Sequence, residues 1–142
     1  MTGEDALTFL QGQFTQELRS SVKAPVAYGL WLNQKGKVLA DSFVLREAEH
    51  SLWVMSFTVG AAVLRERLER YIIADDVVID DQTTLWAGLA VGGVDAGAWL
   101  AEKAGVELPE LGRFLRTTDG FIFRGRRGAG ENWEWIYPRT TA

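Results

Sequence analysis

The strongest constraint on the fold is a regular alternation of residues over positions 26–46, interrupted by one polar turn. Residues 26–33 alternate between large apolar side chains and mostly smaller ones, and residues 37–46 place Asp41 in the same kind of alternation. A period of two is typical of a β-strand, whose successive side chains point to opposite faces. Gln34-Lys35-Gly36 lies between the two segments, so they are predicted to form an antiparallel hairpin.

The rest of the chain continues this mixture of strands and helices. Apolar residues spaced three and four apart predict helices over 5–19, 60–71 and 95–104. Further strands are predicted over 51–57, 77–79, 85–91, 113–117, 121–124 and 133–137. Strands joined as hairpins, with helices set apart from them, favour an α+β fold of antiparallel sheets flanked by helices in two small lobes.

No low-complexity linker divides residues 1–142, which we interpret as one domain region. The chain opens on a helix whose apolar stripe would need an earlier strand to cover it, and it closes directly after a strand. We therefore expect it to be truncated at both ends.

Composition excludes several classes of function. The chain has no cysteine and only one histidine, which excludes disulfides, cysteine nucleophiles, thiolate or iron-sulfur ligation and a histidine-rich metal site. Its net charge of −4 argues against nucleic-acid binding over its whole surface. No apolar run approaches the ~20 residues needed to cross a bilayer, and no signal peptide opens the chain, so we predict a cytoplasmic protein without membrane contact.

Asp41 is the most informative candidate site residue, because it shares a strand face with Leu39, Phe43 and Leu45. A carboxylate on an apolar face is costly unless it is paired or functional. Burial without a cation would raise the pKa of Asp41 and suit it to proton transfer or to binding a proton donor. Alternatively, this face is exposed near the strand end, or Asp41 accepts hydrogen bonds from a neighbouring turn.

Trp53, Met55 and Phe57 alternate along the next predicted strand and therefore share one face. Large flat or polarisable side chains in such a row could form a stacking platform for a heterocycle. The alternative is that they belong to the hydrophobic core.

Other polar residues carry weaker signals. His50 lies in a predicted turn with no second histidine, and the carboxylate pairs 75–76 and 80–81 lack the spacing of a calcium-binding loop, so all are interpreted as surface positions. Five arginines gather in the C-terminal strands: Arg113, Arg116, Arg124, Arg126 and Arg127. They could attract phosphate or RNA, or they could lie on a solvated sheet face.

Two segments resemble a known family. Residues 4–15, Glu-Asp-Ala-Leu-Thr-Phe-Leu-Gln-Gly-Gln-Phe-Thr, and residues 32–41, Leu-Asn-Gln-Lys-Gly-Lys-Val-Leu-Ala-Asp, look like the YgfZ-type folate-binding proteins. These are relatives of GcvT, the aminomethyltransferase of the glycine cleavage system. The resemblance extends over residues 4–81, and Phe-Leu-Gln-Gly-Gln followed by Thr15 is its most specific part.

The resemblance implies a cofactor and its contacts. In the aminomethyltransferases a Gly-Gly-x-x-Asp-Asp hairpin places its second aspartate against the folate, and Asp41 matches that aspartate. Lys37 and Ala40 replace the second glycine and the first aspartate. Trp53, Met55 and Phe57 fall on the positions that face folate in the next strand, although the last is polar in the aminomethyltransferases. The implied cofactor is tetrahydrofolate or a derivative.

The implied role is folate binding in a protein of iron-sulfur cluster assembly or repair, or of the tRNA modification that depends on it. Iron-sulfur client proteins would then be partners of a longer parent. The Lys-Gly-Cys-Tyr-x-Gly-Gln-Glu stretch typical of the YgfZ type is absent here. One alternative is an aminomethyltransferase, which Phe-Leu-Gln-Gly-Gln and Ala40 argue against, so an enzyme is not the favoured interpretation. The other is an RNA-contacting module built on the arginines, with Trp133, Trp135 and Tyr137 as stacking residues.

Overall fold

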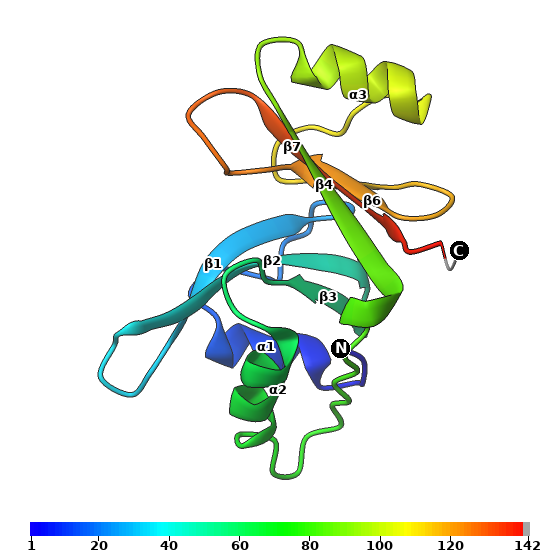
Figure 1. Cartoon of the computed structure of the whole chain (residues 1–142). Helices are drawn as coiled ribbons and strands as arrows, with labels where there is room; N and C mark the ends of the chain where they lie inside the picture. Colours follow the sequence, from blue (N-terminus) through cyan, green and yellow to red (C-terminus); the bar gives the residue numbers. More distant parts are fainter. Residues whose placement is uncertain (141–142) are drawn as a thin grey trace. The chain divides into compact units, whose positions relative to one another are not determined.

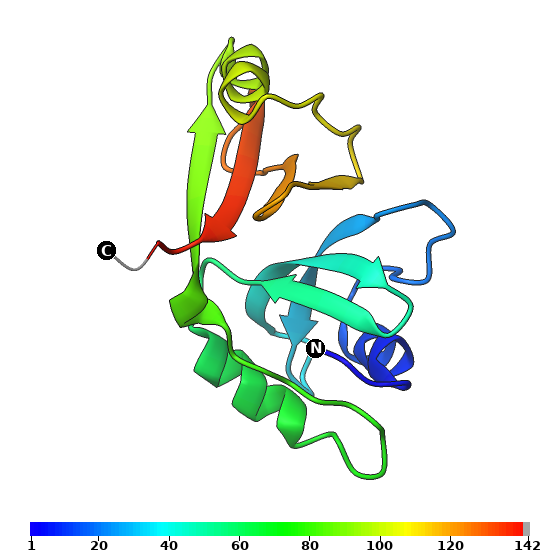
Figure 2. The same ribbon diagram turned by 90° about the vertical axis from the view of Figure 1, so that its right-hand side faces the viewer.

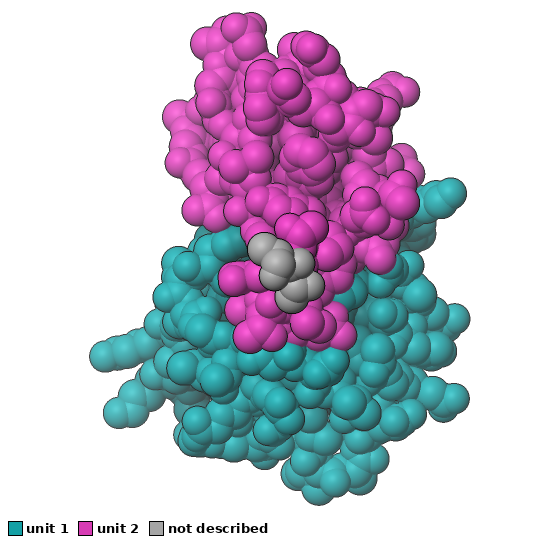
Figure 3. Space-filling view, turned by 45° about the vertical axis from the view of Figure 1, so that its right-hand side comes forward, with its two compact units in different colours: residues 1–81 teal, residues 82–142 magenta. Residues whose placement is uncertain are grey.

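The computed structural model describes residues 1–140. The chain divides into two compact units, Met1–Asp81 and Gln82–Ala142, shown in separate colours in Figure 3. Across residues 1–140, every helix is too short or too polar to traverse a bilayer.

The first unit is a three-stranded antiparallel sheet with two helices on one face (Figure 1). Its strands are β1 (Val26–Leu32), β2 (Val38–Ala48) and β3 (Ser51–Met55), in the order β1-β2-β3, and its helices are α1 (Ala6–Gln13) and α2 (Ala61–Glu69). The predicted hairpin is confirmed, with Tyr28 opposite Phe43 and Leu30 opposite Asp41. The helix-covered face carries Trp31, Val44 and Leu52, which are buried against the two helices.

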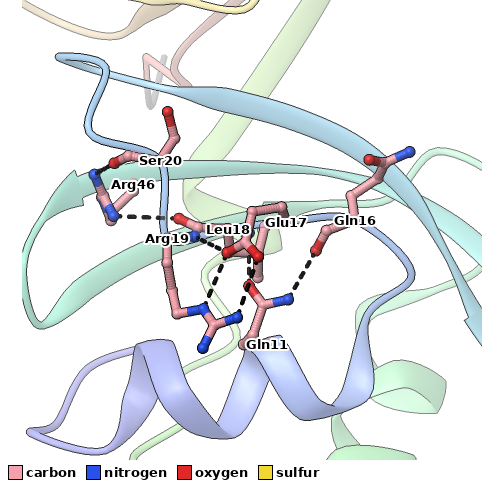
Figure 4. Close-up of polar contacts among 7 residues, drawn as sticks. All are labelled: Gln11, Gln16, Glu17, Leu18, Arg19, Ser20 and Arg46. Atoms are coloured by element: carbon pink, nitrogen blue, oxygen red, sulfur yellow. Dashed lines mark hydrogen bonds and ion pairs between the residues drawn. The ribbon is translucent and has the colours of Figure 1, made fainter.

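Helix α1 ends six residues earlier than its apolar spacing predicts. Gln11 provides the reason, because its side-chain oxygen accepts a hydrogen bond from the Leu18 amide at 2.7 Å and its side-chain nitrogen donates to the Gln16 carbonyl at 3.3 Å (Figure 4). Arg46 of β2 also donates to the carbonyls of Leu18 and Ser20. Leu18 is buried as predicted, but on an extended return segment held by these bonds.

The return segment packs tightly across β1. The Phe14 ring lies 4.8 Å from the Trp31 ring and covers Gly29, where an added Cβ would come within 2.7 Å of Phe14 Cζ. Thr15 fixes the register by donating its amide to the Leu30 carbonyl and accepting the Leu30 amide with its hydroxyl. The apolar stripe of α1 thus reaches a core made by this chain's own sheet, so the expectation that only an earlier strand could cover it is wrong.

The second unit is a four-stranded antiparallel sheet with one helix against it (Figure 2). A short 3-10 helix (Thr83–Leu85) leads into the sheet, whose strand order is β4-β7-β6-β5. Its elements are β4 (Trp86–Gly92), α3 (Ala96–Ala104), β5 (Phe114–Arg116), β6 (Phe121–Arg124) and β7 (Asn132–Pro138). Leu100 of α3 packs with Ile122 and Trp133, and Gly105 ends the helix in the left-handed conformation at φ 65°.

The α+β fold with antiparallel sheets and flanking helices is confirmed, while several boundaries differ. Residues 77–79 form no strand, because Val78 makes only an isolated bridge to Thr2. The third strand ends at Met55 rather than at Phe57.

Candidate functional site

Asp41 lies on β2 at the centre of a small hydrogen-bonded cluster. The Tyr28 hydroxyl donates to one carboxylate oxygen at 2.6 Å, and the Thr58 hydroxyl donates to the other at 2.5 Å. The Ser56 hydroxyl donates to the Asp41 backbone carbonyl at 2.8 Å. Three segments, β1, β2 and the turn after β3, therefore fix the position of this one carboxylate.

These bonds hold the pKa of Asp41 below its ordinary value. The Thr58 hydroxyl contributes most and the Tyr28 hydroxyl next, and together they outweigh the opposing effect of partial burial. The expected rise in the pKa of Asp41 is therefore wrong. Hydroxyl donors stabilise the charged form of Asp41, although this carboxylate forms no ion pair with a basic group within residues 1–140. Asp41 is a carboxylate at neutral pH, and Thr58 comes from a neighbouring turn, as one of the two alternatives predicted.

The carboxylate keeps capacity for a ligand. An ionised carboxylate offers about four lone-pair sites, and the two hydroxyls occupy one on each oxygen. Asp41 is only partly buried. It can therefore accept further hydrogen bonds from N–H groups brought to this face of the sheet.

Aromatic and sulfur-containing side chains lie beside Asp41 on the same face. Met55 is directly opposite Phe43 in the β2–β3 register, and Tyr28 packs against Phe43 with ring centroids 5.1 Å apart. Phe57 meets Phe43 edge-on at 6.2 Å and is 45% exposed. Asp41, Met55 and Phe57 are thus grouped around Phe43.

Trp53 is placed further away on this face. It lies opposite Leu45, and its indole N–H donates to Glu47 at 2.7 Å. At about 3.4 Å per strand residue, the Leu45–Trp53 pair is about 14 Å along the sheet from Asp41. The structure therefore separates Trp53 from the other three predicted site residues.

Sequence reasoning missed the three residues that hold Asp41. Tyr28 could have been found, because pairing the alternating segments through the 34–36 turn brings Tyr28 onto the Asp41 face. Ser56 and Thr58 follow the end of β3, where no periodic pattern shows which way a side chain points.

The weaker candidates have structural roles or are exposed. His50 is exposed between β2 and β3, as predicted. Asp76 accepts the Glu4 amide with its carboxylate and donates its own amide to Asp5, which fastens the start of the chain. Within residues 1–140 no group of three or more histidine, cysteine, aspartate and glutamate side chains could hold a metal ion.

The predicted arginine cluster is largely engaged within the second unit. Arg127 forms an ion pair of 2.6 Å with Glu134, which is 1% exposed. Arg124 lies over the Trp133 ring at 5.2 Å, and Arg116 lies over Phe121 at 4.3 Å. Trp133 is buried in the core of the unit, which removes it from the stacking surface that the RNA alternative requires.

Comparison with known proteins gives concordant results. The family described as GCVT N-terminal domain matches residues 1–121. A protein of Aquifex aeolicus (strain VF5), described as uncharacterized, is 27% identical over 107 residues, which are 75% of this chain and 70% of the relative. The crystal structure of glycine cleavage system aminomethyltransferase T from Bartonella henselae superposes with a TM-score of 0.80 at 23% identity. That match covers 96% of this chain and 38% of the aminomethyltransferase.

Proposed function

We propose, since the chain belongs to the GCVT N-terminal domain family, that it binds tetrahydrofolate or a derivative on the Asp41 face of its first sheet. The family binds tetrahydrofolate generally. The observation that carries the proposal for this chain is the ionised Asp41 carboxylate, held by Tyr28 and Thr58 with acceptor capacity to spare.

The chemistry of a reduced pterin suits this site. A pterin ring presents N–H and amino donors along one edge, and a carboxylate that only accepts hydrogen bonds complements them. Met55 and Phe57 offer apolar and aromatic surface for the faces of the ring, as ligand sites commonly do around a few polar groups. Trp53 offers its indole ring to the bound folate at the end of this sheet face that lies away from Asp41. Asp41 acts as hydrogen-bond acceptor, and any proton transfer from the bound ring would use the same atoms.

The wider role we propose is that of a YgfZ-type protein, in which folate binding serves iron-sulfur cluster maintenance or the dependent tRNA modification in the cytoplasm. Support comes from the resemblance of the 4–15 segment to the YgfZ type. In the structure, Gln11 and Thr15 of this segment hold the return segment that packs on β1. The alternative is an aminomethyltransferase, favoured by the structural similarity to the Bartonella henselae protein. Release of ammonia with a lipoyl carrier and tetrahydrofolate would establish the enzyme, and its absence in the presence of folate binding would favour the binding role.

Tryptophan fluorescence can test folate binding, because the chain contains six tryptophans. Tetrahydrofolate and 5-formyl-tetrahydrofolate are titrated into the wild-type chain, Asp41→Asn and Ser42→Ala. We expect saturable quenching in the wild type and a Kd at least about tenfold higher in Asp41→Asn, since a hydrogen bond to a charged group contributes about 1.5–3 kcal/mol.

Ser42→Ala is the matched control, because Ser42 is the next residue on β2 and faces the helices. Its Kd should remain that of the wild type. An unchanged Kd in Asp41→Asn would remove Asp41 from the site, and a lack of quenching in the wild type would overturn folate binding by this chain.

A further inference from the structure

A concave surface of the first unit lies between the β1–β2 turn and the end of α2. It is a groove of about 510 Å³, within the range of small-ligand sites. Eight residues line it: Asn33, Gln34, Lys35, Lys37, Leu39, Arg67, Arg70 and Tyr71. Asp41 is not among them.

The groove concentrates positive charge in an acidic chain. It is lined by two of the chain's four lysines and by two arginines, yet none of its eight residues is acidic, although the net charge is −4. Glu66 offsets one of the four cations through an ion pair of 2.5 Å with Arg70. Within residues 1–140 the side chains of Lys35, Lys37 and Arg67 have no carboxylate partner.

Arg67 is held by two hydrogen bonds and by contacts with two aromatic rings. It donates to the Leu32 carbonyl at 2.8 Å and to the Gln13 side chain at 3.4 Å. Its guanidinium lies 5.7 Å from the centre of the Trp31 ring and 5.6 Å from that of Tyr71. Arg67 therefore places a positive charge beside Tyr71, which is 42% exposed.

The two lysines are presented by an equally well-defined turn. The Asn33 side chain accepts the amides of Lys35 at 2.9 Å and Lys37 at 3.0 Å, and Gly36 adopts φ 75° between them. Arginines at the C-terminal end of a helix are favourable for its dipole, which gives Arg67 in the last turn and Arg70 at the C-cap a structural role. That reason does not apply to Lys35 and Lys37, which come from a different element and add like charge across the groove.

We propose that this groove binds a nucleotide, with its phosphate groups between Lys35, Lys37 and Arg70 and its base against Tyr71 and Leu39. Clustered lysine and arginine donors match phosphate oxygens, and a bound anion relieves the repulsion among the cations. The exposed Tyr71 ring offers a flat surface on which a base can stack. Asp41 does not line the groove, and this proposal does not rest on the folate proposal.

Calorimetric titration with ADP, adenosine and pyrophosphate tests the proposal. ADP should bind about tenfold or more tightly than either fragment, because only ADP uses both the cations and the ring. The double variant Lys35→Gln/Lys37→Gln should weaken ADP binding about tenfold or more, whereas Lys103→Gln, which removes a lysine on α3 outside the groove, should not change it. Tyr71→Leu should weaken binding of ADP but not of pyrophosphate.

Three results would overturn the nucleotide assignment. They are no ADP binding at millimolar concentration, ADP binding that Lys35→Gln/Lys37→Gln leaves unchanged, and pyrophosphate binding as tightly as ADP. Tetrahydrofolate titration of Lys35→Gln/Lys37→Gln keeps the two proposals apart, because folate binding should be retained there whatever the outcome with ADP.

Discussion

Asp41 and Ser42 are neighbours on β2, yet they put the two faces of one sheet to different uses. Each accepts a hydrogen bond from an aromatic residue of β1, Asp41 from the Tyr28 hydroxyl at 2.6 Å and Ser42 from the Trp31 indole at 2.8 Å. The Ser42–Trp31 pair is neutral, with exposed fractions of 2% and 0%, and lies in the helix-covered core. The Asp41–Tyr28 pair is charged and partly exposed.

The difference shows how one strand pair can carry both stability and a site. A buried hydroxyl with one well-placed donor leaves no polar atom unsatisfied and costs little. A carboxylate needs more donors or solvent, so it remains at a partly open face where a ligand can supply them. Substitutions on the two faces should therefore separate stability from binding.

The largest loss of stability should follow from removing the aromatic member of the buried pair. Trp31 contacts the Phe14 ring and the Arg67 guanidinium and is fully buried. Trp31→Ala leaves a cavity, and we expect its free energy of unfolding to fall by about 3–5 kcal/mol. Urea unfolding measures this, with Val63→Ala on the exposed side of α2 as a control expected to change it by less than about 0.5 kcal/mol. A comparable loss in both variants would contradict the proposed difference.

A smaller loss should follow from removing the hydroxyl of that pair. Ser42→Ala leaves the buried Trp31 indole N–H without its acceptor, and we expect a cost of about 1–3 kcal/mol. Tyr28→Phe on the open face is the counterpart, and it should cost less because water can replace the phenol beside Asp41. Urea unfolding of both variants would contradict the comparison if Tyr28→Phe were the more destabilising.

The fold was largely predictable because alternation and helical spacing report burial directly. The hairpin over residues 26–46 was predictable from its alternating side chains. Asp41 was identifiable as a candidate site residue because its carboxylate interrupts an apolar face. Leu18 misled the prediction of α1, since its spacing from Phe14 continues a helical stripe. Side-chain bonds from Gln11 and Arg46 instead return the chain as an extended segment that buries the same residue.

The environment of Asp41 was less predictable than its position. Its pKa depends on hydroxyl donors that arrive through tertiary structure, and Thr58 lies 17 positions away, in a turn without a periodic pattern. The basic groove was hidden for the same reason, because Lys35 and Arg67 come together only when α2 packs beside the β1–β2 turn.

The smallest expected effect concerns Thr58 and depends on pH. Its hydroxyl is the main cause of the lowered pKa of Asp41, so it stabilises the fold while that carboxylate is charged. This stability is present above the ordinary pKa of 3.8 and is lost as pH falls through the lower pKa of the folded state. Thr58→Val should lower the free energy of unfolding by about 0.5–1.5 kcal/mol near neutral pH and by less in acid.

Urea unfolding at both pH values measures this change in stability. Ser42→Ala is the control, because its lost bond is between neutral groups and should cost the same at both pH values. A Thr58→Val penalty independent of pH would show that the hydroxyl does not act through the Asp41 charge.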